Sequence, residues 1–320
     1  MNANPRIVFY GTPDFAVASL DALLKSGHQV VGVVTAPDRP AGRGLHLSLP
    51  AVKQYALSAN LPLYQPSSLK SDLFVSQLRE LKPDIQVVVA FRMLPRIIWE
   101  MPPFGTFNLH ASLLPQYRGA APINWVLING EEVTGVTTFF INEQIDSGEI
   151  LLQEAVSIGL QETAGELHDR LKEAGARLVV STIREILFEQ IIPVAQREVT
   201  GCTETLHLAP KISKMDTMIN WNEPIDRVFN RIRAFIPHPG ASTVIPLQGE
   251  ELPVKILKAE KGISPEYSGK VEPGRLITDR KTYLYVCAQG GYIDIRTIQP
   301  AGRSTMQVTD FLNGFGGKLC

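Results

Sequence analysis

The first half of the chain alternates short apolar runs with segments of helical periodicity. Six runs rich in β-branched and apolar residues are strand candidates: 6–11, 28–36, 84–91, 106–110, 133–141 and 149–158. Each run has the length of a single buried strand. Apolar strands that alternate with helices are typical of a mostly parallel sheet covered on both faces. The pattern therefore predicts an α/β fold of Rossmann-like architecture.

Two helix starts are visible in the sequence. Thr12 followed by Pro13 predicts an N-cap and a first helical position, and this helix should end near Gly27. Thr163 and Glu166 have the spacing of a capping box, in which each side chain binds the backbone N–H of the other. The apolar residues after Glu166 keep a helical spacing, so a long helix should close the first domain.

The pattern changes near residue 189. A segment of mixed composition covers 190–209, and one helical segment and several short strands separated by Gly, Pro and Asp follow it. Such strands predict a small antiparallel β-barrel of the OB-like kind. We therefore expect an α/β domain at 1–189, a linker at 190–209 and a β-barrel domain at 210–320.

Composition narrows the class of protein. The chain has 320 residues, 44% of them hydrophobic and 20% charged, which is ordinary for a soluble globular protein. Its three cysteines, Cys202, Cys287 and Cys320, fit neither a disulfide framework nor a metal site, and this favours a reducing cytoplasm. The N-terminus lacks the pattern of a signal peptide, and no apolar run approaches the roughly 18 residues of a membrane span.

Charge is distributed unevenly although the net charge is only −1. Residues 211–320 hold 15 Lys and Arg against 11 Asp and Glu, so the remainder of the chain is acidic. A basic C-terminal part is a weak sign of a polyanionic partner. A chance asymmetry of a solvated surface explains it equally well.

A Rossmann-like sheet raises the question of a dinucleotide cofactor. The turn after the first strand of a dinucleotide site carries G-x-G-x-x-G, whereas this chain has GTPDFA with a single glycine. The sequence therefore argues against an NAD-dependent oxidoreductase.

Two polar residues stand out in the apolar run at 106–110. Asn108 and His110 are two apart, so both side chains should point to the same face near the carboxyl end of their strand. That edge is where ligands bind in open parallel sheets. For an isolated pair, a His that binds a backbone carbonyl and an Asn that caps a turn remain an alternative.

Asp146 should lie at the same edge, in the polar loop INEQIDSGEI between two strand candidates. An amide, an imidazole and a carboxylate in one cleft suit acyl transfer without a covalent enzyme intermediate. The amide and the imidazolium would donate hydrogen bonds to the oxyanion of a tetrahedral intermediate. The carboxylate would orient the imidazole, favour its protonated form and accept a proton from an attacking amine. Asp-Ser-Gly is also good turn chemistry, so a plain turn role for Asp146 stays open.

The stretch FNLHASLLPQYRGAAP (107–122) resembles the N-x-H-x-S-L-L-P-x-x-x-G signature of the folate-dependent formyltransferases, with Asp146 in the matching I-D-S-G loop. Four further blocks resemble this family in the expected order: GTPDFA, TAPDRPAGRG (35–44), KISKMDTMINW (211–221) and DFLNG (310–314). The blocks span nearly the whole chain, which makes the resemblance highly specific.

The resemblance implies transfer of a formyl group from 10-formyltetrahydrofolate to the α-amino group of methionine esterified to initiator tRNA. It matches Asn108, His110 and Asp146 to the catalytic residues of the family. It implies neither a metal nor a nicotinamide. The segment expected beside the folate consists of Ser112, Leu113, Leu114 and Pro115. We expect a cytoplasmic monomer, with catalysis in 1–189 and tRNA binding in 210–320.

One segment departs from the family pattern. Related enzymes usually have a Tyr-Gly turn where this chain has AFRMLP at 90–95. Its residues Phe91, Arg92, Met93 and Leu94 are expected to line the pterin pocket. Plain core packing is the alternative for Phe91 and Leu94, and solvent exposure is the alternative for Arg92.

Basic residues mark the expected tRNA contacts. Arg39 and Arg43 lie in a loop rich in Pro and Gly, at the position where the family has a tRNA-contacting loop. Lys211 and Lys214 open the second domain. Without the resemblance, an exposed loop with no specific role explains the arginines as well.

Other interpretations remain at this stage. Arg227 and Arg231 are four apart and would form a basic stripe on a helix, although solvated helix charges are the more ordinary explanation. The acceptor of the formyl group is alternatively a sugar-nucleotide amine. A non-catalytic tRNA-binding protein is a third possibility, although all three catalytic positions are intact.

Overall fold

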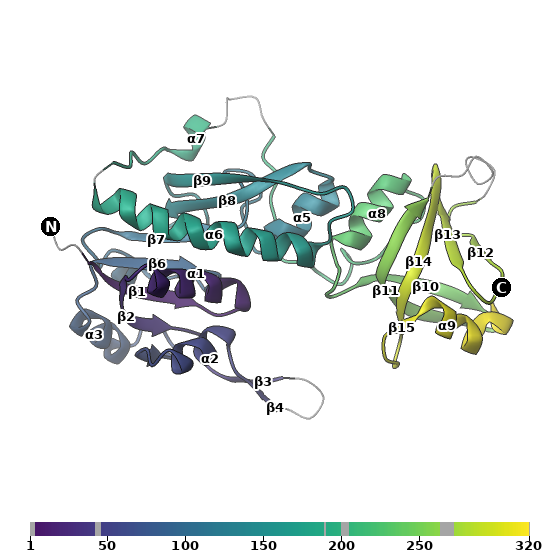
Figure 1. The fold of residues 1–320 in the computed structure, drawn as a ribbon, viewed down its shortest axis with the longest axis horizontal. Coiled ribbons are helices and arrows are strands. Elements are labelled where there is room, and N and C mark those ends of the chain that lie inside the picture. Colours follow the sequence, from purple (N-terminus) through teal and green to yellow (C-terminus); the bar gives the residue numbers. More distant parts are fainter. Residues whose placement is uncertain (1–3, 42–45, 189, 200–204, 263–271, 320) are drawn as a thin grey trace. The chain divides into compact units, whose positions relative to one another are not determined.

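The chain forms two compact units in a computed structural model (Figure 1). The structure describes residues 4–41, 46–188, 190–199, 205–262 and 272–319. The first unit is built from Met1–Gly119, Val133–Ser157 and His168–Leu208, and the second from Ala120–Glu132, Ile158–Leu167 and Ala209–Cys320.

A seven-stranded sheet forms the centre of the first unit, in the order β5-β2-β1-β6-β7-β8-β9. Its strands are β1 (Arg6–Gly11), β2 (Gln29–Val34), β5 (Leu63–Tyr64), β6 (Ile85–Val89), β7 (Thr106–His110), β8 (Val133–Phe140) and β9 (Ile150–Ser157). The first five strands in this order pair in parallel, and β8 and β9 continue the sheet antiparallel. A two-stranded hairpin of β3 (Arg39–Ala41) and β4 (His46–Ser48) stands apart from this sheet.

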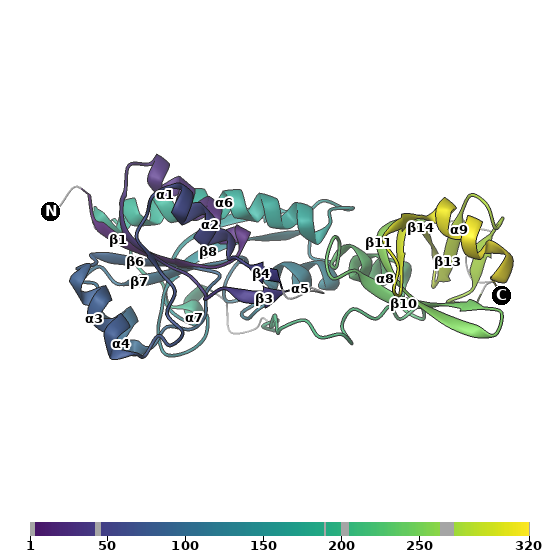
Figure 2. The ribbon, with the colours of Figure 1, turned by 90° about the horizontal axis from the view of Figure 1, so that it is seen from below.

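Helices cover both faces of this sheet, with α1, α2 and α6 on one side and α3 and α4 on the other (Figure 2). The helices of this unit, including the short α7, are α1 (Asp14–Lys25), α2 (Ala51–Ser58), α3 (Asp72–Glu80), α4 (Arg96–Trp99), α6 (Ala164–Leu187) and α7 (Gln196–Val199). Covering both faces explains why the central strands are apolar throughout, as in Ile7, Val8 and Phe9, which are fully buried. Among the described residues, no helix is both long and apolar enough to cross a bilayer.

The two predicted helix starts have different outcomes. Thr163 N–H donates to Glu166 Oε2 at 2.9 Å and Glu166 N–H donates to Thr163 Oγ1 at 3.3 Å, which confirms the capping box of α6. The predicted N-cap role of Thr12 is wrong, because α1 begins at Asp14 with Pro13 as its N-cap. Pro13 has an extended backbone with ψ 176°, so it lies outside the helix and shifts the start by one residue.

An antiparallel sheet curls around the core of the second unit, in the order β10-β11-β14-β13-β12 with β15 paired to β14. Its strands are β10 (Ala241–Leu247), β11 (Glu250–Gly262), β12 (Leu276–Thr278), β13 (Leu284–Ala288), β14 (Gly291–Pro300) and β15 (Met306–Gln307). The helices of this unit are α5 (Pro122–Asn129), α8 (Ile225–Arg233), α9 (Val308–Phe315) and a 3-10 helix (Gly316–Lys318). A mostly parallel α/β sheet followed by a smaller curled β-sheet confirms the predicted fold class.

Candidate active site

Asn108 and His110 lie at the carboxyl end of β7, between β6 and β8. Asn108 pairs with Val88 of β6 and Phe139 of β8, so its backbone position is held by ladders on both sides. Its side chain is only partly buried, and no residue of the described chain forms a hydrogen bond with its amide. His110 is 7% exposed. The two residues therefore place a free amide and a buried imidazole on one face of the strand.

The His110 ring is oriented by the backbone of the loop that follows it. Its Nε2 lies 2.8 Å from the carbonyl oxygen of Tyr117. A carbonyl only accepts hydrogen bonds, so Nε2 carries a proton and donates it in this contact. The orienting contact, which the sequence predicted for Asp146, is made here by the Tyr117 carbonyl. Nδ1 is left on the side of Asp146.

Asp146 comes close to His110, as the position of its loop predicted. Its Oδ2 lies 3.8 Å from Nδ1 of His110 and accepts a hydrogen bond from Gly119 N–H at 3.0 Å. The longer of these distances exceeds a hydrogen bond. Contacts of this kind are often long in a ligand-free enzyme and shorten when substrate binds. Asp146 also has a left-handed backbone with φ +50°, a conformation typical of turns, which accords with the turn role that the sequence left open.

A residue that the sequence analysis missed supports this loop. Gln196, at the start of α7, is 4% exposed and donates from Nε2 to the carbonyls of Asp146 and Gly148, at 2.9 and 2.8 Å. Its Oε1 accepts from the Arg118 guanidinium, from Nε at 2.9 Å and from Nη2 at 2.5 Å. Nothing in the mixed composition around Gln196 indicates such a contact.

Thr137 and Gln153, from β8 and β9, hold the backbone of the segment 112–115. Thr137 Oγ1 donates to the Ser112 carbonyl at 2.6 Å and accepts from Leu114 N–H at 3.1 Å. Gln153 Nε2 donates to the Leu114 carbonyl at 2.9 Å. Ser112, Leu114 and Pro115 are buried, and Leu113 is half-buried. The backbone of this segment, which follows His110 closely in the chain, is therefore fixed by hydrogen bonds from β8 and β9.

The divergent segment borders a surface cavity of about 500 Å³. Arg92, Met93 and Leu94 all line it, together with residues of the loop at 67–70 and of the Asp146 loop. Met93 is 71% exposed, whereas Leu94 is 4% exposed and packs into the core beneath. Phe91 packs its ring against Tyr10, with 5.7 Å between the centroids. The side chains of Phe91 and Leu94 therefore pack largely against the core.

Arg92 brings positive charge to this cavity. Its Nη1 and Nη2 donate to the carbonyls of Ser67 and Pro66, at 3.2 and 2.5 Å. Burial, and then the positive charge of Arg39, lower the pKa of the Arg92 guanidinium. No carboxylate of the described chain pairs with Arg92, and the two contacts leave three of its five N–H donors available. The cavity therefore has a cationic edge suited to an anionic ligand.

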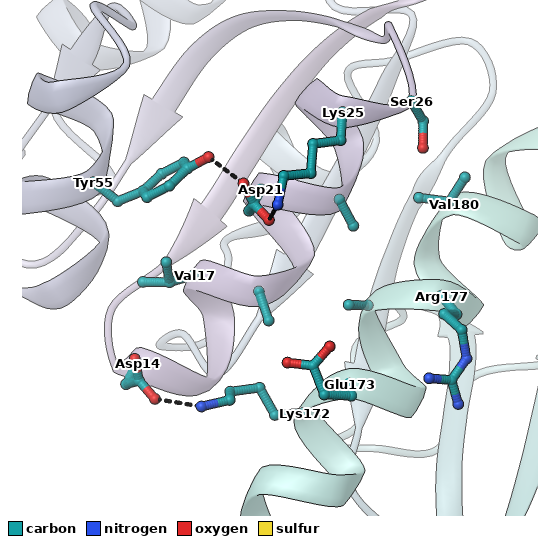
Figure 3. Close-up of a pocket in the computed structure, with 13 residues that line it drawn as sticks. Asp14, Val17, Asp21, Lys25, Ser26, Tyr55, Lys172, Glu173, Arg177 and Val180 are labelled. Carbon is teal, nitrogen blue, oxygen red and sulfur yellow. Dashed lines mark hydrogen bonds and ion pairs between the residues drawn. The ribbon is translucent and has the colours of Figure 1, made fainter.

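A second cavity of about 630 Å³ lies between α1 and α6 (Figure 3). Two ion pairs lie in it, Asp14 with Lys172 at 2.9 Å and Asp21 with Lys25 at 2.8 Å, and the Tyr55 hydroxyl donates to Asp21 at 2.7 Å. None of the residues with predicted roles lines it. We therefore place the candidate site at the end of β7.

The basic residues predicted to contact tRNA have different surroundings. Arg39, Lys211 and Lys214 are exposed, and Arg43 lies outside the described residues. In α8, Arg231, which was weighed as part of a basic stripe with Arg227, donates to the carbonyl of Asp216 at 2.8 Å and lies 3.8 Å from Glu223.

Comparison with known families gives two matches along the chain. Residues 5–183 match the formyl transferase family, and residues 211–316 match the formyl transferase C-terminal domain. A methionyl-tRNA formyltransferase of Azobacteroides pseudotrichonymphae is 49% identical over 97% of this chain and 95% of its own length. A methionyl-tRNA formyltransferase of Parabacteroides distasonis is 48% identical, again over 97% of this chain and 95% of its own length.

Solved structures share the fold at low sequence identity. HypX of Aquifex aeolicus in complex with tetrahydrofolic acid superposes with a TM-score of 0.65 at 18% identity, over 98% of this chain and 48% of HypX. The sugar 3N-formyltransferase WlaRD superposes with a TM-score of 0.64 at 21% identity, over 94% of this chain and 99% of its own. These similarities concern the fold alone.

Proposed function

The chain belongs to the formyl transferase family, and we propose that Asn108, His110 and Asp146 are the residues that catalyse its reaction. The chain formylates the methionine of methionyl initiator tRNA, in line with relatives 46–49% identical over 97% of it that are methionyl-tRNA formyltransferases. We propose 10-formyltetrahydrofolate as the donor. The observation that carries the catalytic assignment is the convergence of an unengaged amide, a buried imidazole and a carboxylate at the end of β7.

The geometry suits a direct transfer between two substrates. The α-amino nitrogen of the methionine attacks the formyl carbon, and the developing oxyanion accepts hydrogen bonds from the Asn108 amide and from Nδ1–H of the His110 imidazolium, whose other proton stays on Nε2. Tyr117 holds the opposite ring nitrogen, so the Nδ1 donor is preorganised. Asp146 accepts the proton lost by the amine, the bond from the formyl carbon to folate N10 breaks, and the Asp146 carboxyl passes that proton to N10, which regenerates the carboxylate. No side chain needs to act as nucleophile in this scheme.

The acceptor distinguishes this proposal from its alternative. We expect purified protein given 10-formyltetrahydrofolate to formylate methionyl initiator tRNA and to leave a sugar-nucleotide amine unchanged. Preference for the amino sugar would support the alternative acceptor. Binding of the tRNA without transfer would indicate a non-catalytic tRNA-binding protein.

Replacing Arg92 with methionine tests the donor side. Folate carries carboxylates, and Arg92, like Lys70, lines the cavity without a described acidic partner. We expect KM for the donor to rise by about 3- to 10-fold while kcat stays nearly constant, because a binding contact outside the reacting centre is lost. Steady-state kinetics at saturating tRNA measure this. Arg79→Met, on the exposed side of α3, is the matched control. An unchanged KM would exclude Arg92 from donor binding.

Replacing Arg39 with alanine tests the tRNA side. Arg39 is exposed in β3 and we propose that it contacts an RNA phosphate together with Arg43. We expect weaker tRNA binding at every salt concentration and a slope of log K against log salt that is shallower by about one unit. Arg184→Ala, in α6, should leave that slope unchanged. A slope unaffected by Arg39→Ala would show that this side chain does not contact phosphate.

A further inference from the structure

The segment between the two predicted domains contacts the candidate catalytic loop directly. Val194 exchanges backbone hydrogen bonds with Ile150 at the start of β9, and Gln196 follows two residues later. All of these residues belong to the first unit. Gln196 thereby reaches the loop of Asp146 from a part of the chain about 50 residues away.

Every polar atom of the Gln196 side chain is used in this contact. Its amide NH₂ donates both protons to the loop, one to the Asp146 carbonyl and one to the Gly148 carbonyl. Its oxygen accepts both hydrogen bonds from Arg118. A buried amide satisfied on all sides has one orientation, since a flip would set its oxygen against two carbonyls.

These contacts connect the segment that orients His110 to the loop that carries Asp146. Arg118 lies between Tyr117, whose carbonyl holds His110, and Gly119, whose N–H binds the Asp146 carboxylate. Gln196 joins the backbone of Asp146 to Arg118, so it links the loop of the carboxylate to the loop that orients the imidazole. The contacts also fix the backbone of Asp146, whose left-handed φ of +50° is uncommon for residues other than glycine, although Asp adopts it more readily than most.

We propose that Gln196 is a positioning residue for Asp146, which keeps the carboxylate on Gly119 N–H and beside His110 Nδ1. This inference rests on the proposed catalytic role of Asp146. Gln196 touches neither of the reacting groups itself. It acts by holding the backbone at Asp146 in the one conformation that presents the carboxylate to the cleft.

Gln196→Met is the direct test, because methionine keeps the length of the side chain and loses all four hydrogen bonds. We expect kcat to fall by about 10- to 100-fold, since a misplacement of about 1 Å at a reacting group costs this much. KM for both substrates should change little. Hydrogen exchange of the Gly119 amide should accelerate by about 10-fold, because its bond to Asp146 is no longer maintained.

Two comparisons separate positioning from general destabilisation. Thr182→Val removes a buried hydroxyl that binds Thr138 Oγ1 and the Leu178 carbonyl, and we expect it to leave both kcat and Gly119 exchange unchanged. Adding Gln196→Met to Asp146→Ala should cost no further kcat, since the residue acts through a carboxylate already removed.

Unaltered Gly119 exchange in Gln196→Met would overturn the inference whatever the enzyme's activity. A further loss of kcat in the Asp146→Ala background would do the same. An inactive wild-type protein would instead contradict the proposed function, and the exchange measurement on Gly119 would still decide whether Gln196 positions Asp146.

Discussion

Asn108→Ala should lower kcat for formyl transfer by about 100- to 1,000-fold, the usual effect of losing one donor to an oxyanion. The amide has no described partner that its loss would disrupt, so the fold should be unaffected. Affinity for methionyl initiator tRNA should stay near the wild-type value, because the interaction exists mainly in the transition state. Single-turnover rates and a tRNA binding titration measure the two quantities.

Asn108→Asp sharpens this test. It keeps the size of the side chain but turns a donor into an anionic acceptor facing the developing oxyanion, so its kcat should be no higher than that of Asn108→Ala. Asn313→Ala, at an exposed position of α9, is the control and should behave as wild type. Equal losses of kcat and tRNA affinity in Asn108→Ala would mean that Asn108 is structural.

Gly148→Ala should have the second large effect, through the backbone of the Asp146 loop. A Cβ at residue 148 would stand 1.6 Å from the carbonyl oxygen of Phe140 and 3.4 Å from the ring of Phe139. The closer neighbour is backbone of β8, so the loop itself must move. The Gly148 carbonyl would then leave Gln196, and Asp146 would shift with it. We expect kcat to fall by about 100-fold with the fold retained.

Circular dichroism and kinetics on the same sample check this result. Gly314→Ala is the matched control, because a Cβ there meets nothing within 4 Å and Gly314 has no left-handed backbone. Its kcat should equal that of wild type. Wild-type kcat in Gly148→Ala would contradict the claim that catalysis depends on the conformation of this loop.

Much of the fold and part of the site followed from local patterns. The buried runs gave the strands of the first unit because both faces of that sheet are covered, which makes the central strands apolar throughout. The pair Asn108 and His110 followed from the two-residue period of a strand. Asp146 followed from the rule that ligands bind at the carboxyl edge of a parallel sheet.

The supporting contacts did not follow, because they depend on tertiary structure. Tyr117 contacts His110 through its backbone carbonyl, which every residue has, so the residue type at position 117 does not predict this contact. Gln196 lies in a segment without periodicity, and its partners are known only once α7 packs on the Asp146 loop. Arg231 was weighed as part of a basic stripe by its helical spacing, but its carbonyl and carboxylate partners lie upstream of α8 in the chain.

A rapid-quench single turnover tests the central claim most directly. Wild-type protein is loaded with formyl-labelled 10-formyltetrahydrofolate and mixed with methionyl initiator tRNA, and label is followed on folate, tRNA and protein. Direct transfer at Asn108, His110 and Asp146 predicts that label leaves the folate and appears on the methionine at one rate, with none on the protein. Label that accumulates on the protein first, or never reaches the tRNA, would contradict it.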